Sequence, residues 1–221
     1  MEIAENIQRL KQSIPAYVRI VAVSKTVPET DMLEAYHCNH RIFGENRVQE
    51  LLRKQINLPR DIEWHMIGHL QSNKVKYIAP FIAMIHSVDN LDLLSVINQE
   101  AIKNNRVIRC LLQIRIAQEE TKYGLSPEGA NELLSAREFQ RMKNISICGL
   151  MGMATFTQDI AQIRSEFRSL AGCFRQVKSD HFSACESFSE LSMGMSGDYP
   201  IALEEGATLL RIGTLIFGER T

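Results

Sequence analysis

The sequence lacks the features that mark membrane, disulfide-stapled and nucleic-acid-binding chains. No apolar run in its 221 residues approaches the roughly 20 residues that a membrane-spanning helix needs. The five cysteines form no C-x-x-C pair and are odd in number, which argues against a disulfide framework and favours a reducing, cytoplasmic location. The net charge is -1 and Lys and Arg are scattered, so we expect neither a membrane nor a nucleic-acid partner.

A dividing linker is also lacking. No Pro- or Gly-rich segment interrupts the chain, and its length suits one large core, so we expect residues 1–221 to form a single domain. Ile3, Ile7 and Leu10 recur at helical spacing with charged residues between them. This pattern predicts an additional amphipathic helix at the N-terminus and is unlike the uninterrupted apolar core of a signal peptide.

Short apolar runs recur along the chain, and each is followed by a polar stretch with helical periodicity. Eight strands alternating with helices, several of them apolar on both faces, predict a parallel sheet closed into a (β/α)8 TIM barrel. An open, doubly wound sheet is the alternative, because strand order cannot be read from one sequence. The predicted strands are 20–24, 41–44, 62–68, 84–88, 107–116, 145–151, 190–194 and 209–213.

Two helix starts are readable between these strands. Ser126 before Pro127 combines an N-cap residue with proline at the first helical position. The clearest helix is predicted from about Asp159 to Val177, with Thr157 as its cap. Its apolar stripe is Ile160, Ile163, Phe167, Leu170, Phe174 and Val177.

In a barrel the functional site lies at the carboxyl ends of the strands, so the residues that follow each apolar run are candidates. Lys25 follows the first run, which would place its amine at the barrel mouth, partly withdrawn from water. Such burial lowers the pKa of an amine and favours attack on an aldehyde, the requirement for a Schiff base. A solvated lysine at a strand end is the alternative interpretation.

Small residues follow the seventh and eighth strands. Ser196 and Gly197 come after one, and Gly213 and Thr214 after the other. Free backbone N–H groups and bare glycine backbone bind anions, and barrel phosphate sites often use these two loops. The alternatives are that Ser196 caps the next helix and that Gly213 permits close packing.

Arg211 lies within the apolar eighth strand, where a buried guanidinium needs a partner such as a cofactor ring nitrogen or a carboxylate. His37, Cys38 and His40 match no usual zinc spacing, so we interpret them as surface residues. His65, inside a predicted strand, is interpreted as a packed core residue.

With these residues in place, the chain resembles the pyridoxal 5′-phosphate (PLP) homeostasis protein family, the YggS-like proteins related to the barrel domain of alanine racemase. The resemblance spans nearly the whole chain. It rests on seven motifs in order: VAVSKTVP at 21–28, FGENRVQEL at 43–51, WHMIGHLQSNK at 64–74, TKYGL at 121–125, GLMGMAT at 149–155, LSMGMSGD at 191–198 and LRIGTLIFG at 210–218.

The resemblance implies a PLP-binding barrel of the alanine racemase type that serves in intracellular vitamin B6 homeostasis, buffering PLP or delivering it to apo-enzymes. It implies that Lys25 holds PLP as a Schiff base and that Arg211 faces the pyridine nitrogen. Asn46 is then close to the cofactor ring, and Met153 and His69 are wall residues. The phosphate is implied to lie on Ser196, Gly197, Gly213 and Thr214.

Two other functions compete with this one. A small racemase-like PLP enzyme would need a second acid or base, for which Tyr123 and Tyr199 are candidates, although the chain ends at Thr221 without the added domain of alanine racemase. An Arg at the pyridine nitrogen also weakens the ring as an electron sink. The other competitor is a phosphosugar barrel enzyme with a Schiff-base lysine and no PLP.

Two further points stay open in the sequence. The sequence does not decide whether Lys74, Lys76 or Lys122 forms a secondary PLP site. A closed barrel presents no free sheet edge, so we expect a monomer.

Overall fold

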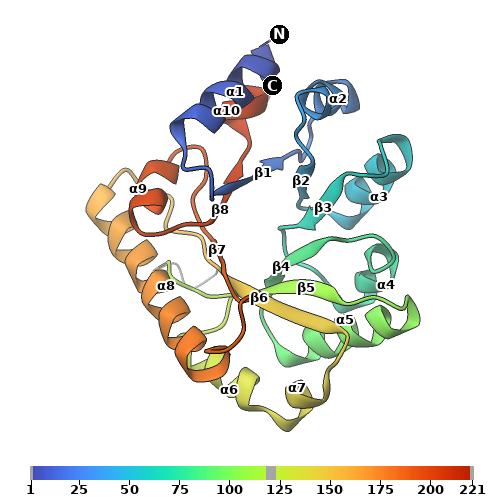
Figure 1. Cartoon of the computed structure of the whole chain (residues 1–221), viewed down its shortest axis with the longest axis vertical. Coiled ribbons are helices and arrows are strands. Elements are labelled where there is room, and N and C mark those ends of the chain that lie inside the picture. Colours follow the sequence, from blue (N-terminus) through green and yellow to red (C-terminus); the bar gives the residue numbers. More distant parts are fainter. Residues whose placement is uncertain (1, 118–122, 220–221) are drawn as a thin grey trace.

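Parallel β-strands close into a barrel in the computed structural model, which describes residues 2–117 and 123–219 (Figure 1). The eight strands pair in chain order, and β8 pairs with β1 to complete the ring. This closure confirms the predicted (β/α)8 barrel and excludes the open sheet. The strands are β1 Arg19–Val23, β2 Ile42–Glu45, β3 Glu63–Met66, β4 Met84–Val88, β5 Ile108–Gln113, β6 Ile145–Met151, β7 Glu190–Ser192 and β8 Leu209–Ile212.

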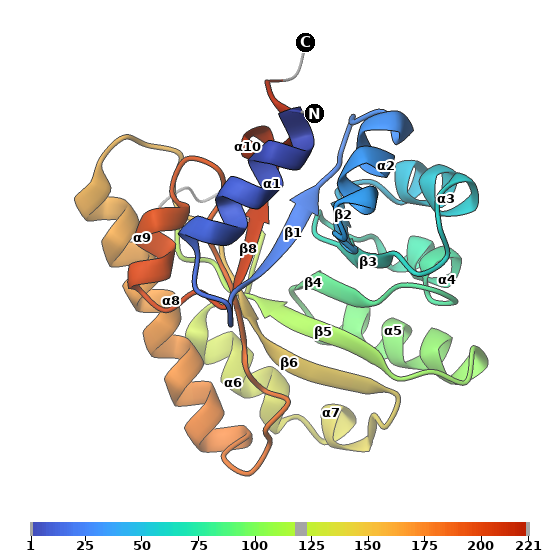
Figure 2. The ribbon, with the colours of Figure 1, turned by 45° about the horizontal axis from the view of Figure 1, so that its top comes forward.

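Helices surround the strands on the outside of the barrel (Figure 2). They bury the apolar outer faces of the strands, which form the larger of the two hydrophobic clusters. No helix in the described ranges is long and apolar enough to cross a bilayer. The helices are α1 Glu2–Ser13, α2 Glu29–His37, α3 Val48–Asn57, α4 Val75–Ile78, α5 Leu91–Lys103, α6 Pro127–Ser135, α7 Arg137–Arg141, α8 Ile160–His181, α9 Tyr199–Glu204 and α10 Thr214–Phe217, with the 3-10 turn η1 at Ser72–Lys74.

The predicted N-terminal helix is present and lies beside the last helix. α1 and α10 are neighbours in both ribbon views, and Asn6 Nδ2 donates a hydrogen bond of 3.2 Å to Ile216 O (Figures 1 and 2). α1 buries Ile3, Ile7 and Leu10, as its periodicity predicts. The first and last parts of the described chain therefore close the same side of the barrel.

Side chains alternate between the two sides of each strand, as β geometry requires. In β8, Leu210 and Ile212 pack outward, whereas Leu209 joins a small apolar cluster inside the barrel. Arg211 also faces inward, where it contacts Ser192 of β7. The barrel interior is thus partly polar, and this polar part lies beneath the functional site described below.

One helix cap differs from the prediction. Asp159, not Thr157, caps α8, because its carboxylate accepts hydrogen bonds from the backbone N–H groups of Ala161 (2.9 Å) and Gln162 (3.1 Å). Ile160 is therefore the first helical residue and is 60% exposed, so its place on the apolar stripe was wrong. The Ser126–Pro127 start of α6 is confirmed.

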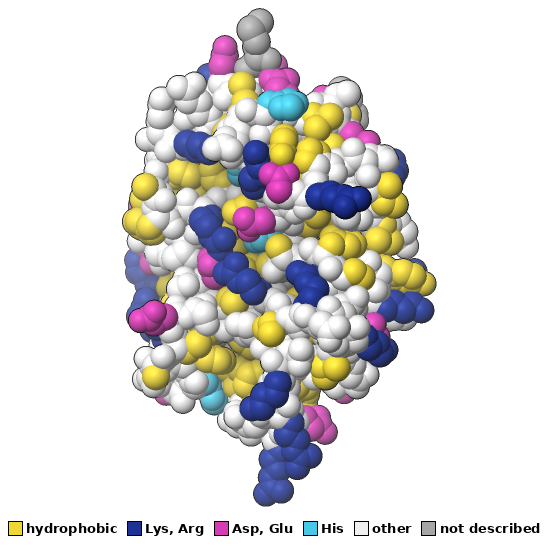
Figure 3. All heavy atoms as spheres, turned by 45° about the vertical axis from the view of Figure 1, so that its right-hand side comes forward, with side chains coloured by type: hydrophobic (Ala, Val, Ile, Leu, Met, Phe, Trp, Pro, Cys, Tyr) yellow, Lys and Arg dark blue, Asp and Glu magenta, His cyan; other side chains and the backbone are white. Residues whose placement is uncertain are grey.

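Charged side chains of both signs share the face shown in Figure 3, where acidic residues lie among the Lys and Arg residues. This mixture agrees with a net charge of -1. It differs from the continuous basic surface that proteins use to neutralise several phosphates of a nucleic acid.

Candidate functional site

A cavity of about 490 Å³ opens where the strands end at their carboxyl termini. Its volume falls in the usual range for small-molecule sites, roughly 300–1,000 Å³. It brings together every residue predicted for the cofactor site, from six different loops or strands. These residues are Lys25, Asn46, Met153, Ser196, Gly197, Arg211, Gly213 and Thr214.

A second cavity of about 460 Å³ lies at the amino ends of β1 and β2. None of the predicted site residues lines it. Two of its basic residues are already engaged, because Arg41 bonds to Asp61 and to Tyr36 O, both at 2.8 Å, and Arg19 pairs with Glu190. We therefore assign the functional site to the cavity at the carboxyl ends.

The backbone before Lys25 is held by a buried lysine that sequence analysis missed. Lys54 of α3 has a fully buried side chain, and its Nζ donates to Ser24 O at 2.5 Å. The same ammonium donates to Glu45 Oε1 (2.8 Å) and Glu50 Oε1 (2.7 Å). Because Glu50 and Lys54 are four residues apart on a helix, their spacing alone is typical of an exposed ion pair.

The backbone after Lys25 is held by the same group of charges. The N–H of Thr26 donates to Glu50 Oε1 at 2.6 Å. Thr26 has a φ of 62°, a left-handed conformation that is rare for a β-branched residue and costs on the order of 1–3 kcal/mol. The residues on both sides of Lys25 are therefore fixed by contacts from α3, and we call this arrangement the lysine end of the cavity.

The pKa values of the two carboxylates at the lysine end, Glu45 and Glu50, are shifted in opposite directions. Burial raises the pKa of Glu45, against the opposing effect of its contact with Lys54. Burial also acts on Glu50, but hydrogen bonds from Lys54 and from the Thr26 N–H overcome it and lower the pKa of Glu50. Glu50 is consequently the firmer counter-ion of Lys54.

The opposite side of the cavity, which we call the phosphate end, consists of the loops after β7 and β8. Ser196 Oγ accepts hydrogen bonds from the backbone N–H groups of Gly213 (3.3 Å) and Leu215 (3.4 Å), so it joins the two loops. The alternative that Ser196 caps α9 is wrong, because α9 begins only at Tyr199. A Cβ built on Gly197 would have no atom within 4 Å, so its backbone is open to a ligand.

Arg211 lies in the cavity between these two ends and is only 4% exposed. Its guanidinium donates to Ser192 Oγ at 2.7 Å and to Gly152 O at 2.9 Å. Burial lowers the pKa of Arg211 to about 10, which leaves the group cationic at neutral pH. No ion pair within the described residues involves Arg211, so its charge is available to a ligand.

Asn46 and Met153 line the cavity wall. Gly68 makes the position of Asn46 possible, because a Cβ there would lie 2.5 Å from Asn46 O. His69 is not part of the cavity lining but stacks on Tyr123, with ring centroids 4.0 Å apart. The expectation that His69 is a wall residue was therefore wrong.

The tyrosines and lysines considered for other roles lie outside the cavity lining where the structure describes them. Neither Tyr123 nor Tyr199 lines the cavity, so neither is placed to act as a second acid or base there. Lys74 and Lys76 lie near the Tyr77 ring, at 5.9 and 5.0 Å, and also lie outside the cavity lining. Thr121 and Lys122, the first two residues of the TKYGL motif, lie outside the described residues.

The surface position predicted for His40 was wrong, whereas the core position predicted for His65 is confirmed. His40 is buried, not on the surface as expected, because its Nε2 lies 2.9 Å from Ile42 O and its ring packs edge-on against Phe43. Burial lowers the pKa of His40 to about 4. His65 is a fully buried core residue, as predicted.

Comparison with known proteins agrees with this geometry. The sequence model of the alanine racemase N-terminal domain matches residues 1–221. A pyridoxal phosphate homeostasis protein of Aquifex aeolicus is 41% identical over 203 residues, which cover 91% of this chain and 87% of the relative. The chain belongs to the pyridoxal phosphate homeostasis protein family.

Two solved structures of a similar protein superpose on this barrel. PipY of Synechococcus elongatus PCC7942, determined without PLP, superposes with a TM-score of 0.90 at 35% identity, over 98% of this chain and 100% of PipY. PipY with PLP bound superposes with a TM-score of 0.88 at 34% identity and the same coverage. The family resemblance noted from the seven motifs is therefore confirmed.

Proposed function

We propose that residues 1–221 act as one domain that binds PLP as a Schiff base on Lys25 and serves in intracellular PLP homeostasis. The observation that carries this proposal is that one cavity is lined by a lysine, by a buried guanidinium without an ion-pair partner among the described residues, and by two loops rich in small residues, with open backbone at Gly197. PLP presents a reactive aldehyde, a ring nitrogen and a phosphate. The three features of the cavity are complementary to these three groups.

Each proposed site residue has one task in this assignment. The aldehyde of PLP, when bound, supplies the carbon to which the Lys25 amine attaches. Arg211 would donate a hydrogen bond to the ring nitrogen, and Asn46 and Met153, which line the same cavity, would form walls beside the ring. The phosphate would be received by the loops of Ser196, Gly197, Gly213 and Thr214. The N–H of Gly213 already donates to Ser196 Oγ, so the remaining backbone N–H groups of these loops would bind the anion.

A storage or delivery role fits these residues better than catalysis on amino acids. A guanidinium keeps its proton, so Arg211 discourages protonation of the ring nitrogen and weakens the ring as an electron sink. Of the described residues that line the cavity, the other ionisable side chains are Lys25 and Asp198, and Asp198 Oδ1 already accepts from Met195 N at 2.5 Å. We infer a non-catalytic, monomeric, cytoplasmic carrier whose partners are apo-enzymes that use PLP.

Two measurements on the loaded protein test this function. Protein saturated with PLP and freed of excess cofactor is mixed with an apo-aminotransferase, and recovery of aminotransferase activity is followed. We expect recovery, together with no exchange of the α-hydrogen of amino acids with solvent deuterium. Exchange at catalytic turnover would establish the racemase-like alternative, and a protein that never acquires PLP would support the phosphosugar enzyme.

A further inference from the structure

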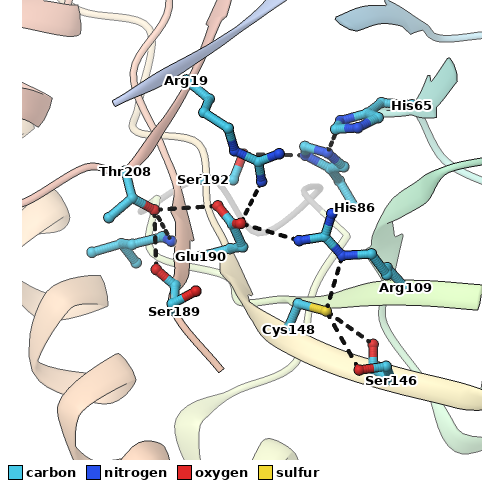
Figure 4. A network of polar contacts seen from close by, with 11 residues as sticks. Arg19, His65, His86, Arg109, Ser146, Cys148, Ser189, Glu190, Ser192 and Thr208 are labelled. Atoms are coloured by element: carbon cyan, nitrogen blue, oxygen red, sulfur yellow. Dashed lines mark hydrogen bonds and ion pairs between the residues drawn. The ribbon is translucent and has the colours of Figure 1, made fainter. Parts of the chain in front are cut away.

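A chain of buried polar side chains runs through the barrel interior behind Arg211. His86 of β4 lies with its Nδ1 3.2 Å from Ser192 Oγ and its Nε2 2.9 Å from His65 Nδ1 (Figure 4). Ser192 Oγ also accepts the 2.7 Å hydrogen bond from Arg211. All three residues behind Arg211 are fully buried, and none of them lines the PLP cavity. We call Arg211, Ser192, His86 and His65 the interior chain.

Both histidines of the interior chain are neutral. Burial lowers the pKa of His65 to about 3, and the nearby cations Arg19 and Arg109 act in the same direction. Burial likewise lowers the pKa of His86 well below its usual value. Figure 4 shows these arginines beside the two imidazoles, joined to each other through Glu190. Each imidazole therefore carries one N–H donor and one acceptor nitrogen.

Neutral imidazoles give the interior chain a direction. Arg211 donates to Ser192 Oγ, so the hydroxyl hydrogen of Ser192 is free to be donated to His86 Nδ1. His86 then carries its hydrogen on Nε2 and donates to His65 Nδ1. This order leaves one buried hydrogen without a partner among the described residues, the one on His65 Nε2. The reverse order would leave two groups unpaired, the Ser192 hydroxyl hydrogen and the acceptor nitrogen His65 Nε2, and is therefore less favourable. All donors therefore point away from the cavity.

This direction strengthens the contact to Arg211. A hydroxyl that donates its hydrogen becomes a better acceptor, because successive hydrogen bonds polarise one another in a low-dielectric interior. Resting on the proposed function, we propose that His86 is a positioning residue, which acts through Ser192 to hold the Arg211 guanidinium toward the ring nitrogen of PLP. His65, one step further along the interior chain, supports His86 in the same role.

Substitutions at His86 test this role. In His86→Leu the Ser192 hydroxyl loses its acceptor, so we expect the dissociation constant of PLP to rise about tenfold and the absorbance maximum of the Schiff base to shift. In His86→Asn the amide oxygen takes the approximate place of Nδ1, and we expect both properties to return to within about twofold of wild type. His65→Leu should fall between these variants.

A matched control separates positioning from stability. Thr208→Val removes hydrogen bonds on the opposite side of the network in Figure 4, where Thr208 Oγ1 accepts from Leu191 N at 2.8 Å and does not touch Arg211. We expect this variant to unfold at lower denaturant concentration and to keep the wild-type spectrum and PLP affinity. Ser192→Ala replaces His86→Leu if that variant fails to fold, with the same expected loss.

Three results would overturn the inference. One is wild-type affinity and spectrum in His86→Leu or Ser192→Ala. The second is a loss of affinity in Thr208→Val equal to that in His86→Leu at equal loss of stability, and the third is a failure of Asn to rescue His86. A wild-type protein that shows no Schiff-base absorbance would instead overturn the proposed function, and this inference with it.

Discussion

The two ends of the cavity are built from different groups. At the lysine end, the buried Lys54 and two carboxylates fix the backbone on both sides of Lys25, and Thr26 is held in a left-handed conformation. At the phosphate end, one hydroxyl joins two loops through neutral hydrogen bonds to backbone N–H groups. Buried charges hold the backbone at one end, whereas an uncharged hydroxyl joins the two loops of the other.

The difference follows from what each end has to bind. A covalent bond to Lys25 requires an amine in a fixed place, and a buried lysine that donates three hydrogen bonds, as Lys54 does, gives fixed geometry at a cost in desolvation. A phosphate brings its own charge and needs accessible N–H donors, which small residues leave uncovered. Four experiments test whether the two ends differ in this way.

Lys54→Met should have the largest effect, because it leaves the buried Glu45 and the partly buried Glu50 without their cation. Removal of one partner of a buried ion pair costs about 3–5 kcal/mol. The free energy of unfolding from urea denaturation measures the loss. The control is Lys103→Met, whose exposed pair with Glu100 (2.6 Å) should contribute less than about 1 kcal/mol. Equal losses of unfolding free energy in the two variants would show that the ion pairs of the lysine end contribute no more to stability than an exposed pair.

Acid should lower the stability of the fold through the buried His65 of the interior chain. His65 has its pKa lowered to about 3 in the fold and an unfolded value near 6.5, so the unfolded chain binds more protons between these pH values. Its contribution to stability is full above about pH 6.5 and is lost as pH falls, by up to about 1.4 kcal/mol per pH unit.

Urea midpoints between pH 7 and pH 4.5 test this dependence. The midpoint should fall with pH in the wild type and fall less steeply in His65→Phe. His37→Ala, at an exposed position, should keep the wild-type slope. A slope that is the same in His65→Phe and in the wild type would contradict the neutral, buried state of His65.

Ser196→Ala should weaken the phosphate end more than the protein as a whole. The backbone N–H groups of Gly213 and Leu215 lose their shared acceptor, which costs about 1 kcal/mol of stability. We expect the dissociation constant of PLP to rise about tenfold, because the two loops are no longer joined. Ser13→Ala removes a hydroxyl contact to Leu10 O at the end of α1 and should leave PLP binding unchanged. Unchanged binding in Ser196→Ala would show that the loops are held by other contacts.

Thr26→Gly should have the smallest effect on stability. Glycine relieves the strain of the positive φ but loses more backbone freedom on folding, so the two terms nearly cancel within about 1 kcal/mol. PLP binding should still weaken by a few-fold, because the backbone beside Lys25 is less restricted. Asn39→Gly, at the same φ of 62° away from the cavity, should leave binding unchanged. Unaltered binding in Thr26→Gly would show that the backbone restriction at Thr26 does not contribute to PLP affinity.

The sequence was sufficient for the barrel and for the composition of the cavity. Strands could be located because their apolar runs are buried on both faces, and Arg211 was recognisable as inward because it interrupts such a run. Strand ends then placed Lys25 and Gly213 at the mouth by the geometry of parallel barrels.

What could not be predicted depends on contacts between distant segments. The partners of Ser196 lie in the loop after β8, so its local position near α9 indicated a cap that the structure does not form. Lys54 lies on a helix, where its spacing to Glu50 is that of a solvent-exposed pair. The contact between His86 and His65 joins neighbouring strands across the barrel interior, and no local pattern in the sequence predicts it.

Reduction with borohydride followed by peptide mapping identifies the lysine that holds PLP. The treatment converts a Schiff base between PLP and a lysine into a stable secondary amine, so the modified peptide identifies the lysine. We expect the label on the peptide that contains Lys25, and no label there in Lys25→Ala. A label confined to Lys74, Lys76 or any other lysine of the wild-type protein would contradict the assignment of this cavity as the PLP site.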